Sequence, residues 1–144
     1  MNAEALAVIL AVLGPNPAVD KEELTCAAQN VWHEARGGST DDWAAVTLVV
    51  MNRAWSSRYP EAICDVVWQP HQFSWTRDGR SDDVEPGALW QRIVEAAYET
   101  LRGGVPDFTD GAVFYHTPAV SPHWAQDMTE VGVFGKHVFY REGP

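Results

Sequence analysis

Glu34 is the residue of this sequence best placed to do chemistry, because it stands near the end of an amphipathic helix that Gly37 and Gly38 interrupt. A rotation of about 100° per residue puts Glu34 beside Ala27, at the edge of the apolar stripe, and puts His33 on the opposite side, toward water. A carboxyl group at such an edge is partly removed from water, which raises its pKa and makes it a proton donor near neutral pH. The plainer alternative is a last-turn glutamate with its head in solvent, although a carboxylate there opposes the helix dipole.

Metal and covalent chemistries lack the residue patterns that they need. His33 and Glu34 begin like a zincin motif, but Gly37 stands where the second metal-binding histidine would be. The sequence has no nucleophile elbow around a serine and no glycine-rich phosphate loop. The spacing of the later histidines matches no standard metal site; these are His116, His123 and His137. We therefore expect no metal and no cofactor.

The remaining chemistry is that of carboxylates, and a glycoside hydrolase normally uses two of them. Asp41 and Asp42 are the nearest to Glu34 in sequence, but they fall in the first turn of the next helix, where they are expected to complement its dipole. Without a second carboxylate, one glutamate can protonate the leaving oxygen and then take a proton from a hydroxyl of the substrate itself. A lytic transglycosylase works in this way, with the C6 hydroxyl of muramic acid in place of water.

Two helices must position this glutamate, and each begins with a capping pattern. Asp20, followed three residues later by a glutamate, predicts the start of the helix that carries the candidate acid. Ser39, followed at the same distance by an aspartate, predicts a second and mostly apolar helix that runs to about residue 56 and forms the centre of the fold. Asn52 and Arg53 are polar exceptions in it. They are expected to point to solvent or to cap the helix end, or alternatively to brace the loop after the first helix.

The other elements follow from hydrophobic patterning and from the positions of proline. Residues 3–13 predict an N-terminal helix docked on the domain, too short to cross a bilayer. Residues 57–85 are mostly irregular, and their aromatic and amide side chains favour a functional loop over a disordered one. Pro86 starts a third helix with Leu89 on its inner side, and strands are expected at residues 112–116 and 136–141. The sequence therefore predicts an α+β fold, a single and mainly helical domain with a small β element.

The composition excludes some partners and locations. A formal net charge of −10 without a cluster of basic residues argues against nucleic acid and against anionic membranes. Seven tryptophans are more than a core of this size needs, so some are expected to line a groove where flat rings stack on sugars. The apolar N-terminal run lacks a basic flank, which predicts no signal peptide and synthesis in the cytoplasm. Cys26 and Cys64 lack zinc or CxxC spacing, so free thiols are the default expectation and a disulfide stays open.

Four short motifs follow one another between residues 24 and 140. They are Glu34-Ala35-Arg36-Gly37, Asn52-Arg53, Gln69-Pro70 with Phe73-Ser74, and Gly135 with His137 and Phe139. In these residues and in their order the chain resembles the SleB-type cell-wall hydrolases. That family comprises the catalytic domains of spore-cortex-lytic enzymes and of related phage and bacterial proteins.

The resemblance implies a lysozyme-like or transglycosylase-like enzyme that cleaves the glycan strand of peptidoglycan between N-acetylmuramic acid and N-acetylglucosamine. It implies Glu34 as general acid and base in one catalytic domain, residues 1–144, with an N-terminal helix and linker over residues 1–17 and a hydrolase core over residues 20–142. The expected substrate-binding residues are Gln72, Ser74, Tyr115, His116, Trp124 and Arg36, although Arg36 is explained equally well as a surface arginine. His137, Phe73 and Phe139 are expected to be structural.

Two other functions stay open. An N-acetylmuramoyl-L-alanine amidase would cut the same substrate at its amide bond and would need a metal or an unrecognised nucleophile. A non-catalytic virion component would only hold peptidoglycan in its tryptophan-rich groove. We expect peptidoglycan glycan strands as partner, a monomer, no nucleic acid and no membrane insertion. The lack of a wall-binding domain and of a secretion signal fits a phage-type endolysin that reaches the wall after holin-dependent release.

Overall fold

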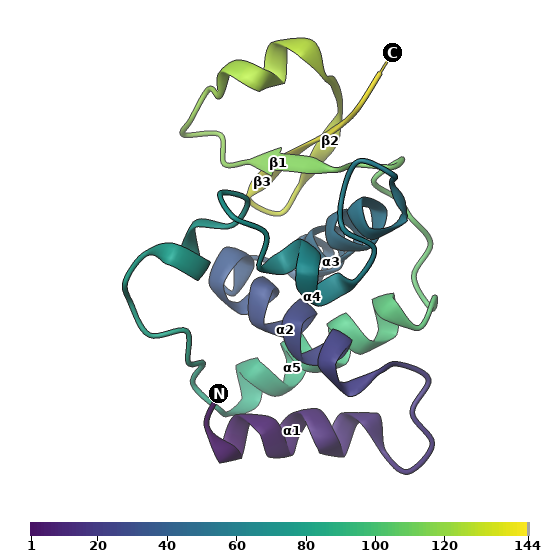
Figure 1. The fold of residues 1–144 in the computed structure, drawn as a ribbon, viewed down its shortest axis with the longest axis vertical. Coiled ribbons are helices and arrows are strands. Elements are labelled where there is room, and N and C mark those ends of the chain that lie inside the picture. The colour runs from purple at the N-terminus through teal and green to yellow at the C-terminus, as the bar shows by residue number, and fades with distance from the viewer. Residues whose placement is uncertain (144) are drawn as a thin grey trace.

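In the computed structural model, which describes residues 1–143, a body of α-helices carries a three-stranded sheet at one end (Figure 1). The helices are α1 (Ala3–Leu13), α2 (Lys21–Ala35), α3 (Thr40–Trp55), α4 (Ile63–Val67) and α5 (Ala88–Leu101). The strands are β1 (Phe114–His116), β2 (Thr129–Phe134) and β3 (His137–Arg141), and short 3-10 helices span Ser74–Arg77 and His123–Asp127. The mainly helical α+β fold predicted from the sequence is confirmed.

Both predicted helix starts are present. The side chain of Asp20 accepts hydrogen bonds from the backbone N–H groups of Glu22 and Glu23 at the start of α2. The side chain of Ser39 accepts one from the backbone N–H of Asp42 at the start of α3. These bonds satisfy N–H groups that have no partner within the helix. The stretch of α3 from Asp42 to Met51 is buried throughout, as expected for the centre of the fold.

Helix α3 packs against α2 and α5, and α1 closes the far end of the body (Figure 1). The indole N–H of Trp90 in α5 donates to the carbonyl oxygen of Ala5 in α1 (3.0 Å). The indole N–H of Trp43 in α3 donates to the carbonyl oxygen of Ala35 (2.8 Å). Because Ala35 is the last residue of α2, this second bond fixes the turn that carries Glu34 against α3.

The sheet has the order β1–β3–β2, and both pairs are antiparallel. Its central strand β3 carries Phe139, which is fully buried in the core and lies opposite Tyr115 of β1. The strands predicted at residues 112–116 and 136–141 are present in slightly shorter form. Strand β2 was not predicted, because a bulge near Gly132 shifts its pairing and breaks the alternation of apolar and polar residues.

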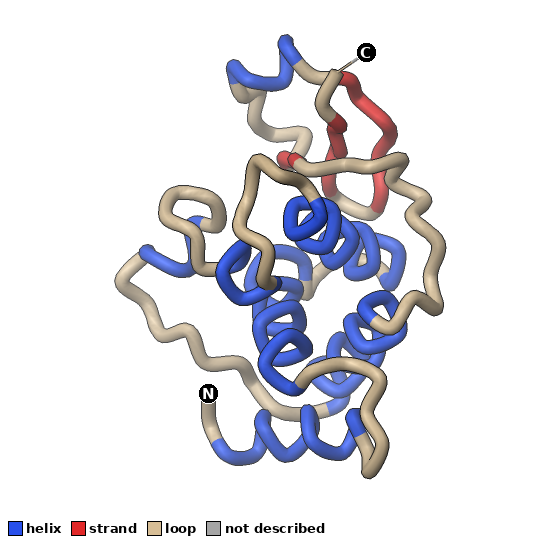
Figure 2. The backbone as a smooth tube through the Cα atoms, turned by 45° about the vertical axis from the view of Figure 1, so that its right-hand side comes forward, coloured by secondary structure: helices blue, strands red, loops and turns tan. Residues whose placement is uncertain are grey.

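The segment that leads to α5 departs from expectation at two points. Helix α5 begins at Ala88 with Gly87 as its N-cap, so Pro86 precedes the helix instead of starting it. Leu89 is 37% exposed, because the first turn of α5 borders a surface hollow and not the core. Residues 57–85 are irregular apart from α4 and a 3-10 helix. The connection from that 3-10 helix to α5 runs along one side of the body (Figure 2).

A disulfide bond joins Cys26 of α2 to Cys64 of α4, so the default expectation of free thiols is wrong. The two cysteines are 38 residues apart, and their spacing gives no signal for the pairing. The bond holds α4 against the helix that carries Glu34. It thereby also anchors the irregular segment that follows α4.

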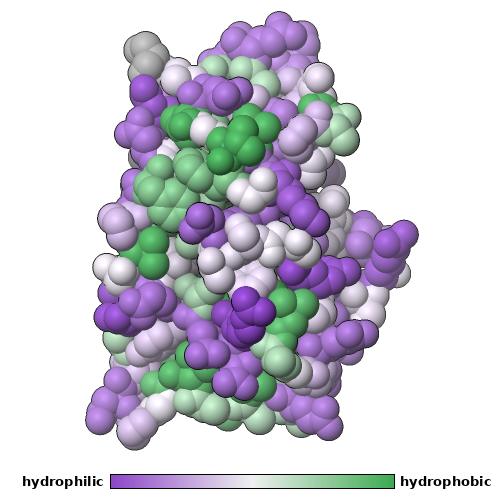
Figure 3. Space-filling model, turned by 180° about the vertical axis from the view of Figure 1, so that it is seen from behind, coloured by the Kyte–Doolittle hydropathy of each residue, from purple (hydrophilic) through white to green (hydrophobic). Residues whose placement is uncertain are grey.

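The surface mixes polar and apolar side chains. The face opposite to that of Figure 1 shows apolar patches separated by polar areas (Figure 3). Trp55, at the end of α3, is 74% exposed. Within residues 1–143, no helix combines the length and the apolar character that crossing a membrane requires.

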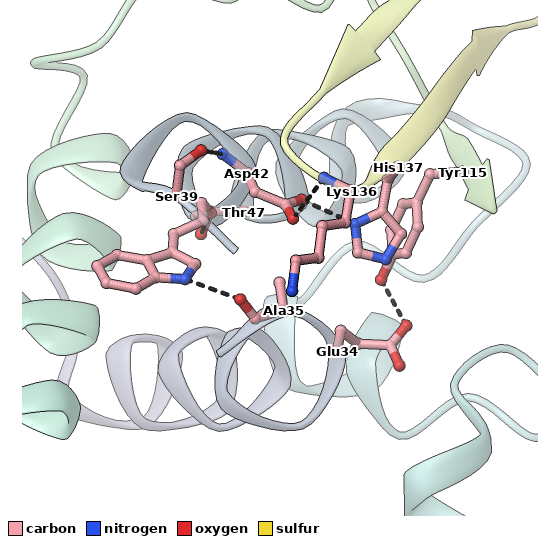
Figure 4. Close-up of polar contacts among 9 residues, drawn as sticks. Glu34, Ala35, Ser39, Asp42, Thr47, Tyr115, Lys136 and His137 are labelled. Carbon is pink, nitrogen blue, oxygen red and sulfur yellow. Dashed lines mark hydrogen bonds and ion pairs between the residues drawn. The ribbon is translucent and has the colours of Figure 1, made fainter. Parts of the chain in front are cut away.

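The buried carboxylate of Asp42 joins α3 to the sheet (Figure 4). Its Oδ1 lies 2.8 Å from Nδ1 of His137, and its Oδ2 accepts a hydrogen bond from the backbone N–H of Lys136 (3.2 Å). The role expected for Asp42, that of a helix-dipole partner, therefore leaves out its bonds to the sheet, for which it is fully buried. The neighbouring Asp41 is exposed. Gly135 (φ 59°) permits the close approach, since a Cβ there would lie 2.4 Å from the Cβ of Asp42.

Reduction of the disulfide between Cys26 and Cys64 is expected to lower the free energy of unfolding by about 3 kcal/mol, because the bond closes a long loop in the unfolded chain. Chemical denaturation with and without a reductant measures the difference. A variant with both cysteines replaced by alanine is the control and should give the same midpoint in both conditions. Equal midpoints for the unmodified protein would show that the bond contributes nothing.

Replacement of Asp42 by alanine is expected to cost about 3 kcal/mol of stability, because it leaves a buried histidine and a backbone N–H without their acceptor. Asp41→Ala removes the same charge from the same helix turn at an exposed position and should change stability by less than about 0.5 kcal/mol. Urea unfolding of both variants tests this expectation. A similar small effect for both would contradict the structural role of Asp42.

Candidate active site

Glu34 lies in the last turn of α2, at a point where three surface hollows meet. Their volumes are about 530, 390 and 210 Å³, and we call them the large, middle and small hollows. The large hollow extends toward α5, the middle hollow toward the turn between β2 and β3, and the small hollow toward β1. Characteristic lining residues are Trp75 and Leu89 in the large hollow, Gly37 and Lys136 in the middle hollow, and Gln72 and Trp124 in the small hollow.

The environment of the Glu34 carboxyl group favours its protonated form. Burial raises its pKa above the usual value for glutamate, as the helix rotation predicted. A hydrogen bond from Tyr115 and the nearby His137, Arg53 and His33 oppose this rise without cancelling it. The group is therefore a better proton donor near neutral pH than an exposed glutamate, yet it keeps partners that stabilise its anion.

Tyr115 is the direct partner of Glu34. Its hydroxyl donates a hydrogen bond to Oε1 of Glu34, at 2.5 Å (Figure 4). Its ring packs on Phe139 (5.3 Å between centroids) and against the edge of His137 (4.9 Å). Burial and the adjacent Glu34 raise the pKa of Tyr115 well above its usual value, so the hydroxyl stays a donor. The bond fixes one carboxyl oxygen and leaves the other for a ligand.

Arg53 is buried beneath the small hollow, contrary to the expectation that it points to solvent. Its Nε donates to the carbonyl oxygen of Val113 (2.7 Å), and its Nη1 donates to Oε1 of Gln72 (3.2 Å). The guanidinium lies 4.8 to 5.2 Å from the centres of three aromatic rings. Asn52 donates to the carbonyl oxygen of Ala112 (3.0 Å). The pair thus braces the approach to β1 and the loop at Gln72, and not the loop after α2.

Five of the six predicted substrate-binding residues line a hollow that includes Glu34. Gln72, Tyr115 and Trp124 line the small hollow, Ser74 lines the large one, and Arg36 lines both the large and the middle hollows. His116 is not in the lining of these three hollows; its Nε2 lies 2.8 Å from the hydroxyl of Tyr140. The binding roles of all six residues stay predictions.

His33 was predicted on the side of α2 that faces water, but it is half-buried in the structure. Its ring stacks on Trp75 at 4.4 Å between centroids, and its Nε2 lies 3.0 Å from the carbonyl oxygen of Asp82. The indole N–H of Trp75 in turn donates to Oδ1 of Asn30 (2.9 Å). Helix rotation gave no signal for this arrangement, because the covering residues come from the irregular segment before α5.

Further polar residues of the hollows were also missed. Lys136 lines the middle hollow, and a group of carboxylates lines the large one, namely Asp78, Asp83 and Glu85. These residues are 44 or more positions away from Glu34 in the chain. The polar character of the loop at residues 77–83 was a signal for Asp78 and Asp83, but not for Glu85 or Lys136.

Two other hollows of the described chain also hold titratable groups, one of them with Asp110, Arg141 and Glu142 near the end of α3, but neither includes Glu34. A hollow of about 560 Å³ between α1 and α5 is lined largely by alanine and valine, with Glu95 and Glu99 at one side. Within residues 1–143, no three histidine, cysteine, aspartate or glutamate side chains are grouped so as to hold a metal ion. Of the seven tryptophans, Trp32, Trp75 and Trp124 line hollows beside Glu34. Trp32 and Trp75 are buried and Trp124 is half-exposed, so the expected aromatic groove stays a prediction.

Two relatives show how this chain compares with known proteins. It is 27% identical over 120 residues to a spore cortex-lytic enzyme of Oceanobacillus iheyensis, and the matched region covers 83% of this chain and 41% of the relative. It is 29% identical over 119 residues to the spore cortex-lytic enzyme of Bacillus subtilis, which covers 81% of this chain and 37% of the relative. The chain therefore spans about two fifths of the length of these relatives.

Solved structures give the same picture for the fold. The catalytic domain of the Bacillus cereus SleB protein superposes with a TM-score of 0.69 at 25% identity, over 88% of this chain and 94% of that domain. The catalytic domain of the germination-specific lytic transglycosylase SleB from Bacillus anthracis gives 0.70 at 26% identity, over 88% and 99%. The Cell Wall Hydrolase family model matches residues 37–140, a range that begins just after Glu34. Since this match covers most of the sequence and confirms the predicted SleB-type resemblance, the chain belongs to the Cell Wall Hydrolase family.

Proposed function

We propose that this chain degrades peptidoglycan by cleaving its glycan strand between N-acetylmuramic acid and N-acetylglucosamine, with Glu34 as general acid and base. The observation that carries the proposal is the position of Glu34, a carboxyl group with a raised pKa at the junction of three hollows. Family membership and the names of the relatives, a spore cortex-lytic enzyme and a lytic transglycosylase, support the same substrate.

The reaction proposed is that of a lytic transglycosylase. Protonated Glu34 gives its proton to the glycosidic oxygen as the bond from C1 of muramic acid breaks. The resulting carboxylate then takes the proton of the C6 hydroxyl of the same sugar, whose oxygen bonds to C1 and closes a 1,6-anhydro ring. Burial favours the protonated form of Glu34 that the first step needs, whereas the Tyr115 hydroxyl and the positive charge of Arg53 stabilise the carboxylate that the second step needs.

The small hollow supplies groups that suit a sugar. Arg53 holds the side-chain oxygen of Gln72, so the amide N–H groups of Gln72 are oriented as donors for an acetamido or hydroxyl oxygen. Trp124 in the same hollow offers an aromatic face for a sugar ring. Ser74, exposed in the large hollow, can contact a neighbouring sugar.

A hydrolase that uses water is the second candidate, because Asp78, Asp83 and Glu85 line the large hollow together with Glu34. One of these carboxylates could serve as the second group that a glycoside hydrolase requires. Asp42 is a weaker candidate than the sequence suggested, because both of its oxygens already accept hydrogen bonds.

We also propose that residues 1–143 act as one domain on the bacterial cell wall, without a nucleic-acid partner. The contact between α1 and α5, with Ile9 fully buried, supports a common core for the N-terminal helix and the family-matched range. A monomeric state and holin-dependent release stay predictions from the sequence.

Replacement of Glu34 by glutamine is expected to lower the release of soluble fragments from purified peptidoglycan by at least about 100-fold, because the general acid is lost. Mass spectrometry of the fragments from the unmodified enzyme should show 1,6-anhydro-muramic acid ends. The variant should be at least as stable as the parent above the raised pKa of Glu34. Burial makes the charged carboxylate costly to the fold, so stability falls as pH rises from the unfolded to the folded pKa.

Each other product has a distinct meaning. Reducing-end muropeptides would indicate a hydrolase and direct attention to the three carboxylates of the large hollow. Free stem peptides would indicate an amidase and reject the proposed bond. Binding to peptidoglycan without any soluble product would indicate a non-catalytic wall-binding protein, and full activity of Glu34→Gln would reject the proposed acid.

Replacement of Tyr115 by phenylalanine is expected to shift the alkaline limb of the pH–activity profile to higher pH. The tyrosine hydroxyl stabilises the Glu34 anion and so lowers the pKa of that group; without it the pKa rises, and the active protonated form persists to higher pH. Tyr98→Phe, which removes a hydroxyl in α5 that is bonded to the backbone N–H of Ala18, is the matched control. An unmoved alkaline limb would reject the proposed coupling.

A further inference from the structure

We propose that the middle hollow binds a carboxylate carried by the substituent of muramic acid, through Lys136 and Arg36. The proposal rests on the proposed function and adds a binding subsite to it. Of the two sugars that alternate in the glycan strand, muramic acid is the one that carries a lactyl group and a stem peptide. A carboxylate subsite beside Glu34 would therefore select the position and the direction of the strand.

The first support is the charge of the hollow. The protein has 20 acidic and 10 basic residues. Within residues 1–143, Arg58 pairs with Glu142 and Arg102 with Glu99, whereas the exposed Arg77, Arg80 and Arg92 have no carboxylate within ion-pair distance. Lys136 and Arg36 are exposed in the same described range, but no carboxylate lies within ion-pair distance of either. What distinguishes Lys136 and Arg36 from those arginines is their position, because both line one hollow together with Glu34, where an external anion can meet two cations.

The second support is the way in which Lys136 is held. Its backbone N–H donates to the buried Asp42, and Gly135 before it makes the tight turn between β2 and β3. From this turn the lysine side chain extends toward the end of α2, on the side where Glu34 lies (Figure 4). Its Nζ is 3.4 Å from the position that a Cβ of Gly37 would occupy. The backbone of Lys136 is therefore fixed, and in the structure its charge lies next to Gly37.

Arg36 completes the pair from the other element. It is the C-cap of α2, and its Nη1 donates to the carbonyl oxygen of Trp32 (3.0 Å), with the guanidinium 5.3 Å from the Trp32 ring. These contacts limit the motion of the guanidinium and leave other N–H groups free to donate to a ligand. Asp42, the other carboxylate in the hollow besides Glu34, has both oxygens occupied by Lys136 and His137.

The large hollow has the opposite character. Besides Glu34, three carboxylates line it, against two arginines, one of which is Arg36. The N-terminal amine lies 3.6 Å from one of the three, Asp83. A carboxylate on the ligand is therefore attracted on the middle-hollow side of Glu34 and disfavoured on the other side. This difference gives the strand one preferred direction across the candidate acid.

Two groups of the substrate could supply the carboxylate, which are the free lactyl carboxyl and the carboxyl groups of the stem peptide. The test uses Glu34→Gln protein, which binds without cleaving, and three soluble ligands made from the same disaccharide. The first carries a stem peptide, the second carries a free lactyl carboxylate, and the third carries a lactyl group converted to a neutral amide. Dissociation constants are compared with and without Lys136→Gln.

We expect Lys136→Gln to weaken binding of at least one carboxylate ligand by about fivefold and to leave binding of the neutral ligand unchanged. Weaker binding of the peptide ligand alone assigns the subsite to the stem peptide. Weaker binding of the ligand with a free lactyl carboxylate assigns it to the lactyl group. Lys136→Arg should restore binding, and Lys21→Gln, which makes the same charge change at the exposed start of α2, should have no effect. High salt should reduce the difference.

Three results would overturn the inference. They are equal binding by both proteins for every ligand, equal weakening for the neutral and charged ligands, and no measurable binding of any ligand. These outcomes do not depend on cleavage. They can therefore be told apart from failure of the proposed function, which is measured by the products of the unmodified enzyme.

Discussion

The candidate site depends on one buried set of hydrogen bonds, those between Asp42 and the turn from β2 to β3. Asp42 belongs to the first turn of α3, and through His137 and Lys136 it fixes the sheet on the helical body. Strand β3 then sets β1 by antiparallel pairing, with Tyr115 opposite Phe139. The tyrosine that reaches Glu34 is thus positioned by a carboxylate to which it is not bonded. A buried carboxylate without these partners would be costly, so the sheet and α3 stabilise each other.

In the role proposed for it, Glu34 is subject to two opposing requirements, and its surroundings suit both. A general acid must hold its proton near neutral pH, and burial provides this by raising the pKa. The same group must exist as an anion after it has given the proton away, and the Tyr115 hydroxyl with the nearby cations lowers the cost of that state. The charged form of Glu34 therefore costs the fold more free energy than an exposed carboxylate would, as is common for residues at functional sites.

The sequence predicted what local rules determine. Capping at Asp20 and Ser39 located both helices, and helix rotation located the partly desolvated side of α2. Contacts between segments that are distant in the sequence could not be predicted from it. Asp42 and His137 are 95 residues apart, and the covering of His33 comes from an irregular segment. In the same way, Gln72, Tyr115 and Trp124 were named from a family resemblance, and only the fold brings them to one hollow. The disulfide and strand β2 were missed because neither has a periodic signal.

The net charge of −10 does not describe what a ligand meets close to Glu34. At physiological salt, charges are screened beyond about 8 Å, so the groups that line the hollows act on a bound strand more strongly than acidic residues elsewhere on the surface. Next to Glu34, exposed cations line the middle hollow and carboxylates dominate the large one. Repulsion from an anionic wall then lowers the rate of encounter, whereas the local difference sets the direction of a strand that has already bound. Added salt weakens the first effect more than the second, because the distances inside the hollows are shorter than the screening length.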